Sequence, residues 1–221
     1  MSLNGAIDRQ DRIQNILILS SLVFGAVYLF DDFGFGAPYP LDVVIKATGI
    51  VLLGLFALRR GYPLLATGLL AGSAGDAFLA LQPAQIAYGI GAFGLGHIIY
   101  IVIFADRLRQ TGLRGMPGYV GAGVLVIFGA VMLTYLQPHF GDLRVAASIY
   151  NGIILVMAIL AVLGRPPMLA TIGALLFVVS DSVLAMRMFA DLLPWGGPVV
   201  WVTYYLGQAG IALGLAQPQR R

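Results

Sequence analysis

The stretch LLFVVSDSVLA, residues 175–185, places one carboxylate, Asp181, inside an apolar run that extends from 167 to 189. A run of about 20 apolar residues is long enough for a helix that crosses a membrane. An intramembrane charge costs about 2.5–3.5 kcal/mol on insertion scales, so Asp181 is expected to face other helices and a partner rather than lipid. The stretch therefore predicts a transmembrane helix that carries a paired or functional carboxylate.

The whole chain shares this apolar character. Of its 221 residues, 59% are hydrophobic and 10% are charged, and the mean hydropathy is +0.90. Soluble domains have about 45–50% apolar and about 25% charged residues. The sequence contains no cysteine, which excludes a disulfide, a cysteine-ligated metal and a thiol nucleophile. We expect a polytopic membrane protein.

Apolar runs of similar length recur along the chain, bounded by Pro, Gly, Arg and Asp. They predict an all-α protein that forms a single integral membrane domain over residues 1–221, with eight transmembrane helices near 13–30, 41–58, 62–81, 84–105, 117–136, 144–163, 167–189 and 198–216. The first run lacks a small-residue cleavage pattern, so we interpret it as a retained helix rather than a signal peptide. The short connections place any activity within or at the bilayer.

The arginines predict the orientation. Ten of the twelve fall on one side of the expected topology, and only Arg144 and Arg187 fall on the other. Because cytoplasmic segments are enriched in Lys and Arg, both termini are expected in the cytoplasm, and a bacterial protein of this kind would lie in the inner, plasma membrane. The net charge of +3 comes from scattered arginines rather than a basic stripe, so nucleic acid is not expected as a partner.

The third and seventh apolar runs resemble each other. PLLAT at 63–67 precedes Asp76, and PMLAT at 167–171 precedes Asp181, with proline-to-aspartate offsets of 13 and 14 residues. The runs that follow them contain FGLGH at 93–97 and YYLGQ at 204–208. We interpret the chain as two parallel four-helix repeats.

Few hydrogen-bonding side chains occur inside the predicted spans. The candidates are Lys46, Asp76, His97, Tyr150, Asn151, Ser180, Asp181, Tyr204 and Gln208. Helical spacing places Gly68, Gly72 and Asp76 on one face, where the glycines would let a neighbouring backbone approach. At about 1.5 Å of rise per residue, Lys46 and the two aspartates fall at a similar depth in the outer half of the membrane.

Two further faces mix aromatic surface with one hydrogen-bonding group, as a pocket for a lipid chain would require. Their members are Phe93, His97, Tyr100 and Phe104 in one span and Trp201, Tyr204, Gln208 and Ile211 in another. Structural roles remain open: Lys46 could form an ion pair or snorkel to the interface, and the amides, His97 and the tyrosines could serve packing alone. One ion pair would leave the second carboxylate unexplained, which favours function for the aspartates.

Other chemistries have less support. The chain has two histidines, of which His139 falls in a connection, and it has no HExxH spacing, so neither a metal nor another cofactor is expected. No Gly-x-Ser-x-Gly motif occurs, although Ser180 beside Asp181 keeps a serine nucleophile open.

Taken in order, these motifs resemble the YhhN family of lysoplasmalogenases. The matching residues are Lys46, Asp76 after glycine, His97 and Tyr100 in GLGHIIY, Ser180 and Asp181 in FVVSDSVLA, and Tyr204, Tyr205 and Gln208 in YYLGQ. One departure is the segment IKATGI around Lys46, where many relatives are expected to have a proline just after the lysine. This departure concerns the helix geometry at Lys46 more than the aspartates.

The resemblance implies an eight-span hydrolase that cleaves the vinyl ether bond of lysoplasmalogens into a fatty aldehyde and glycerophosphoethanolamine or glycerophosphocholine. A lysophospholipid would be the substrate and membrane lipid the surroundings. Our hypothesis assigns Asp76 and Asp181 to acid–base catalysis, one protonated and one ionised, without deciding which does which. The residues expected to bind or orient substrate are Lys46, His97, Tyr100, Tyr150, Asn151, Ser180, Tyr204, Tyr205 and Gln208.

Two other classes compete with this hypothesis. A small transporter or lipid-binding protein without hydrolytic activity is favoured by the repeated halves and the polar groups at mid-membrane depth. Against it, the repeats are parallel and no span is interrupted in its middle. A metal-dependent lipid amidase or phospholipase would instead lose activity to chelators.

Overall fold

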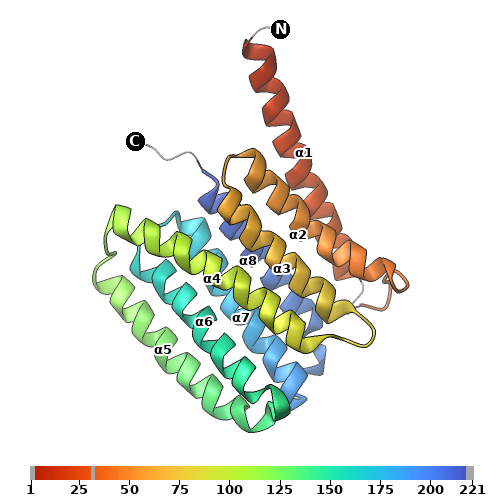
Figure 1. Cartoon of the computed structure of the whole chain (residues 1–221), viewed down its shortest axis with the longest axis vertical. Coiled ribbons are helices and arrows are strands. Elements are labelled where there is room, and N and C mark those ends of the chain that lie inside the picture. Colours follow the sequence, from red (N-terminus) through yellow and green to blue (C-terminus); the bar gives the residue numbers. More distant parts are fainter. Residues whose placement is uncertain (1–2, 31–32, 218–221) are drawn as a thin grey trace.

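The computed structural model describes residues 3–30 and 33–217, which form a bundle of long helices (Figure 1). The helices are α1 (Leu3–Leu29), α2 (Leu41–Arg59), α3 (Pro63–Ala80), α4 (Ile86–Thr111), α5 (Met116–Leu136), α6 (Arg144–Leu163), α7 (Met168–Ala190) and α8 (Gly197–Leu215). Two 3-10 turns, Gln137–His139 and Gly141–Leu143, precede α6, and one, Pro194–Gly196, precedes α8. A helix satisfies its own backbone hydrogen bonds, which an apolar membrane requires.

Within the described residues, eight helices are long and apolar enough to cross a membrane. This confirms the all-α, eight-span prediction. Two helices extend beyond their predicted spans: α1 begins at Leu3 rather than near residue 13, and α4 continues to Thr111 rather than ending near residue 105. Gln110 donates to Asp106 and the Thr111 hydroxyl donates to the Arg107 carbonyl, so polar contacts one turn apart sustain α4 beyond its apolar part. The repeat and the membrane orientation stay predictions.

Helix α8 lies at the centre of the bundle. It packs along α7 and also contacts α1, α2 and α3, while α4 packs on α3 and α6. Helices α1 and α5 lie at opposite flanks (Figure 1), and α5 exposes Val124, Ile127 and Val131 as a lipid-facing surface requires. Helix α8 thus packs against α2, α3 and α7, which carry Lys46, Asp76 and Asp181.

The backbones of α7 and α8 are in direct contact. A Cβ atom on Gly173 would lie 2.6 Å from the Gly207 carbonyl oxygen, and one on Gly210 would lie 2.9 Å from the Leu169 carbonyl oxygen. Only glycine permits this approach, as in other small-residue interfaces of membrane helices. The contact fixes the separation between Asp181 on α7 and Gln208 on α8.

The polar residues lie inside the bundle rather than against lipid. Asp76, His97 and Gln208 are 2%, 1% and 1% exposed, and Ser180 is equally buried. The rings of Phe93, Phe177 and Tyr204 pack edge-on against one another, and Phe177 also packs edge-on against His97. The core therefore combines a buried polar network with an aromatic wall.

Candidate active site

The two aspartates line one polar cavity with a volume of about 160 Å³. Asp76 reaches it from α3 and Asp181 from α7, and the cations Lys46 and Arg187 line it as well. The remaining wall consists of Tyr28, Leu79, Phe93, Ser180, Leu184, Met188, Gly197, Val200, Trp201 and Tyr204. Because α3 and α7 end and α8 begins near these residues, the cavity lies toward the end of the bundle away from the chain termini.

A chain of hydrogen bonds ends on Asp76. The Tyr204 hydroxyl donates to Asp76 Oδ2 over 2.5 Å, and the Gln208 amide nitrogen donates to the Tyr204 oxygen over 3.3 Å. The Gln208 carbonyl oxygen in turn accepts from the Tyr100 hydroxyl over 2.7 Å. The Tyr204 hydroxyl donates its only hydrogen to the carboxylate and can only accept from Gln208. The Gln208 amide must therefore direct its nitrogen toward Tyr204 and its oxygen toward Tyr100. The orientation of Asp76 thus depends on three other side chains.

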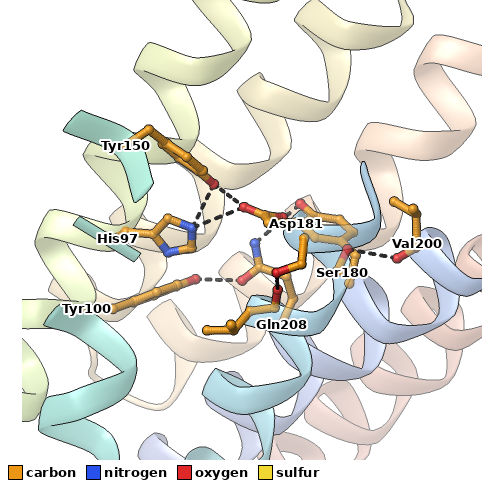
Figure 2. A network of polar contacts seen from close by, with 10 residues as sticks. His97, Tyr100, Tyr150, Ser180, Asp181, Val200 and Gln208 are labelled. Carbon is orange, nitrogen blue, oxygen red and sulfur yellow. Dashed lines mark hydrogen bonds and ion pairs between the residues drawn. The ribbon is translucent and has the colours of Figure 1, made fainter. Parts of the chain in front are cut away.

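A second, shorter chain ends on Asp181 (Figure 2). Tyr150 on α6 donates its hydroxyl hydrogen to Asp181 Oδ2, and its oxygen lies 3.0 Å from His97 Nε2. If Asp181 is ionised, the Tyr150 hydrogen is committed to it, so His97 Nε2 must carry a hydrogen and donate. His97 Nε2 also lies 3.9 Å from Asp181 Oδ2. Each aspartate is therefore held by a tyrosine from another helix.

Three glycines of α3 make room for these side chains. A Cβ on Gly72 would overlap the Gln208 amide nitrogen, one on Gly68 would lie 2.7 Å from the Tyr100 ring, and one on Gly75 would lie 2.7 Å from the Phe93 ring. The predicted glycine face is thus used mainly by incoming side chains. Backbone approach occurs too, because a Cβ on Gly96 of α4 would lie 3.0 Å from the Gly68 carbonyl oxygen.

An apolar cavity of about 90 Å³ meets the polar cavity at Asp181. Leu79, Phe93, Asp181, Leu184 and Met188 line both cavities. The apolar cavity continues between α4, α5, α6 and α7, along Ile86, Ile90, Phe128, Met132, Leu133, Leu136, Phe140, Ala147, Tyr150, Asn151, Ile154, Leu155, Val178, Ser182, Ala185 and Phe189. Pockets for apolar ligands have this composition, with few polar groups among many apolar ones. A ligand with one apolar and one polar end would have its junction at Asp181.

Lys46 lies in the polar cavity beside aromatic rings. Its ammonium is 5.2 Å from the centre of the Tyr28 ring and 5.9 Å from that of the Trp201 ring, and Trp201 is fixed by a hydrogen bond to the Gly25 carbonyl oxygen. Aromatic faces attract a cation in this way. Lys46 is not within ion-pair distance of either aspartate, so the three residues predicted at a similar depth share a cavity without a salt bridge.

Several predicted site residues do not face both cavities. Four of them line neither cavity: His97, Tyr100, Tyr205 and Gln208. Tyr205 instead shares a hydrogen bond of 2.8 Å with Ser21 of α1. The Ser180 hydroxyl donates to the Val200 carbonyl oxygen over 2.9 Å (Figure 2). Asn151 lines only the apolar cavity. In the part of the chain that the structure describes, no three His, Asp or Glu residues gather as a metal site would require. The roles of all these residues stay predictions.

Arg187 lines the polar cavity although it was not among the predicted site residues and served only to predict the orientation. Arg187 lies seven residues after Ser180 and three after Leu184, and all three line the polar cavity. Helical spacing places such residues on one face. This spacing was the signal that could have identified a second cation at the site.

Comparison with known proteins gives a consistent result. The model of the YhhN family matches residues 41–215. Lysoplasmalogenase TMEM86A of Bos taurus is 30% identical over 82% of this chain and 80% of its own length, and lysoplasmalogenase TMEM86B of Homo sapiens is 35% identical over 69% and 64%. The membrane protein YhhN of Shigella flexneri is 30% identical over 72% and 79%. No solved structure matches. Because the family match covers helices α2 to α8 and includes both Asp76 and Asp181, this chain belongs to the YhhN family.

Proposed function

We propose that this chain is a lysoplasmalogenase, which hydrolyses the vinyl ether bond of lysoplasmalogens and releases a fatty aldehyde with glycerophosphoethanolamine or glycerophosphocholine. One observation carries the proposal: a polar cavity with two aspartates and an apolar cavity meet at Asp181. A lysoplasmalogen has the same division, with an alkenyl chain on one side of its ether and a polar head group on the other. The similarity to the lysoplasmalogenases TMEM86A and TMEM86B supports this substrate class.

Hydrolysis of a vinyl ether needs an acid that protonates one vinyl carbon and a base that activates water to attack the other. A vinyl ether is activated when its carbon β to the oxygen takes a proton, which produces an oxocarbenium ion. Water then adds to the carbon bonded to the oxygen, and the resulting hemiacetal separates into aldehyde and alcohol. A positioned acid or base contributes about 10²- to 10⁴-fold to such steps. Two carboxylates facing one cavity can supply both functions.

The cavities suggest how the two roles divide. The carbon that takes the proton lies on the chain side of the ether, and Asp181 lines both the apolar and the polar cavity. The carbon that takes water is bonded to the ether oxygen, and Asp76 lines only the polar cavity. We therefore assign proton donation to Asp181 and activation of water to Asp76. The ionised Asp76 would also stabilise the cation.

The protons balance over one cycle. Asp181 gives its proton to the vinyl carbon, and Asp76 takes a proton from the attacking water. When the hemiacetal collapses, Asp76 returns its proton to the departing glycerol oxygen, and the hemiacetal hydroxyl proton passes to Asp181. One water is consumed, and both carboxyl groups regain their starting states.

The tyrosines act as positioning residues in this scheme. Tyr204, held by Gln208, donates to Asp76 and fixes the direction of its carboxyl group. Tyr150 occupies Asp181 Oδ2 and leaves Oδ1 for the proton that is transferred. His97 supports Tyr150 from the other side. Ser180 is engaged with a backbone carbonyl rather than with a base, which argues against its use as a nucleophile.

The proposal is tested with purified protein in detergent and a lysoplasmenylethanolamine. We expect a fatty aldehyde and glycerophosphoethanolamine in equal amounts, both measured by mass spectrometry. The matched controls are the 1-alkyl lipid, which lacks the double bond, and the 1-acyl lipid, which has an ester. Recovery of the lysoplasmalogen unchanged would favour a transporter or lipid-binding protein, and cleavage of the acyl lipid would favour a phospholipase.

A further inference from the structure

The polar cavity holds two cations whose positions the acid–base scheme leaves unexplained. Lys46 and Arg187 both line it, one from α2 and one from α7. Neither forms an ion pair with a carboxylate of the described residues, although Asp76 and Asp181 line the same cavity. Charges inside a membrane protein are expensive and are usually paired. With Asp76 ionised and Asp181 protonated, as proposed above, the two partly buried cations exceed the negative charge of the cavity by one, which indicates a place for a further anion.

Neighbouring residues hold both cationic side chains in place. Tyr28 and Trp201 flank the Lys46 ammonium. The aliphatic part of Arg187 packs on the 3-10 turn before α8, where a Cβ on Gly196 would lie 3.0 Å from Arg187 Cδ. Gly196 is buried, so this contact is part of the folded structure. A guanidinium held in this way can offer two parallel N–H donors to the oxygens of one phosphate.

We propose that Lys46 and Arg187 bind the phosphate of the lysophospholipid head group, an inference that rests on the proposed function. In the substrate, the phosphate is separated from the vinyl ether by the glycerol unit. In the protein, Arg187 follows Asp181 by six residues, which corresponds to about 9 Å along α7. The apolar cavity leaves Asp181 toward α5 and α6, on which neither cation lies, although its α7 wall continues past Arg187 to Phe189. A phosphate at Arg187 would thus hold the ether at Asp181 with the chain in the apolar cavity.

This arrangement makes Arg187 a specificity-determining residue. It should distinguish a lysoplasmalogen from a 1-alkenylglycerol, which has the same chain and ether but no phosphate. Arg187 rather than Lys46 gives the sharper test, because Lys46 also faces Asp76 across the cavity and could affect the carboxylates directly. Arg144 provides a matched control: it is the other arginine predicted on this side, is exposed, and bonds to Gln137 instead of lining the cavity.

The experiment compares kcat and KM for lysoplasmenylethanolamine and for 1-alkenylglycerol in the wild type, Arg187→Gln, Arg187→Lys and Arg144→Gln proteins. We expect Arg187→Gln to lower kcat/KM for the phospholipid about 10- to 100-fold, mainly through KM, and to lower kcat/KM for the alkenylglycerol far less. Arg187→Lys should retain part of the preference, and Arg144→Gln all of it. Equal losses on both substrates, or no loss on either, would overturn the phosphate site.

Binding separates this inference from the proposed function. Calorimetry with a 1-alkyl lysophosphatidylethanolamine, which cannot be cleaved as a vinyl ether, should show weaker binding by Arg187→Gln than by wild type even if no aldehyde is ever released. Equal binding by the two proteins would contradict the phosphate site while leaving hydrolysis intact. Inorganic phosphate is expected to compete poorly; strong competition that Arg187→Gln abolishes would mean a site for free phosphate and would overturn the head-group assignment.

Discussion

Tyr204 donates a 2.5 Å hydrogen bond to Asp76 from a helix that is five places further along the chain. The bond joins α8 to α3 at the wall of the polar cavity. A short bond from a neutral hydroxyl to a carboxylate is among the stronger hydrogen bonds in proteins. It directs the other carboxylate oxygen of Asp76 and ties the site to the central helix of the bundle.

Removing this hydroxyl should impair the reaction without removing the ring. Tyr204→Phe is expected to lower aldehyde release about 10- to 100-fold, since a hydrogen bond to a charged group contributes about 1.5–3 kcal/mol. It should also change the pH profile of kcat, which a packing defect would not. Tyr205→Phe is the matched control, because Tyr205 bonds to Ser21 on α1. Equal activity of the two variants would contradict a role for Tyr204 in positioning Asp76.

Gly72 should be intolerant of a methyl group. Gly72→Ala places a Cβ where the Gln208 amide lies, so we expect Gln208 to be displaced and the free energy of unfolding to fall by about 1–3 kcal/mol. Aldehyde release should fall with it. Gly91→Ala on α4 is the control, since a Cβ there meets nothing within 4 Å. Thermal unfolding in detergent measures stability, and a Gly72→Ala protein as stable and active as Gly91→Ala would rule out this packing account.

The apolar cavity should limit the length of the alkenyl chain. Ala147 is buried in its wall, and Ala147→Leu should shorten the space available. We expect kcat/KM to fall more for chains of about sixteen carbons than for chains of about eight, by up to about fourfold for each methylene that loses its contacts. Val145→Leu, on an exposed side chain of the same helix, is the control. An identical dependence on chain length in both variants would place the chain elsewhere.

Isotopes should report which bond breaks. In D₂O, the aldehyde should carry one deuterium on the carbon next to its carbonyl group, because that carbon takes the proton held by the enzyme. In ¹⁸O-labelled water, the glycerol product should contain no label, because water attacks the vinyl carbon. Label in the glycerol hydroxyl would show cleavage on the other side of the ether oxygen and would exclude the oxocarbenium route.

The sequence predicts the helices and the meeting of the aspartates because both depend on local patterns. Twenty-residue apolar runs define spans, and a charge within a span must turn inward. The choice of tyrosine partners was beyond such reasoning, since it depends on how α6 and α8 are rotated against α7 and α3. Tyr204 and Tyr205 illustrate the difference: adjacent residues of a helix point about 100° apart, so one reaches Asp76 and the other reaches Ser21.

Depth estimates alone also gave an incomplete account of the cations. They placed Lys46 near the aspartates, which agrees with the shared cavity, but they left an ion pair and snorkelling as alternatives and did not predict the aromatic neighbours of Lys46. Arg187 contributed only to the prediction of membrane orientation, because a charge near the end of a span can reach the interface and does not require a partner. The turn before α8, which supports its stem, could not be inferred from hydropathy.

The most direct test of the account is the rate of aldehyde release by Asp76→Asn and Asp181→Asn proteins that remain folded, as judged by size-exclusion chromatography and thermal unfolding. Asparagine keeps the shape of each side chain but can neither donate a carboxylic proton nor act as a base. We expect each variant to be slower than wild type by about 10²- to 10⁴-fold in kcat, with the lysoplasmalogen still bound. A rate near that of wild type in either variant would contradict catalysis by the pair.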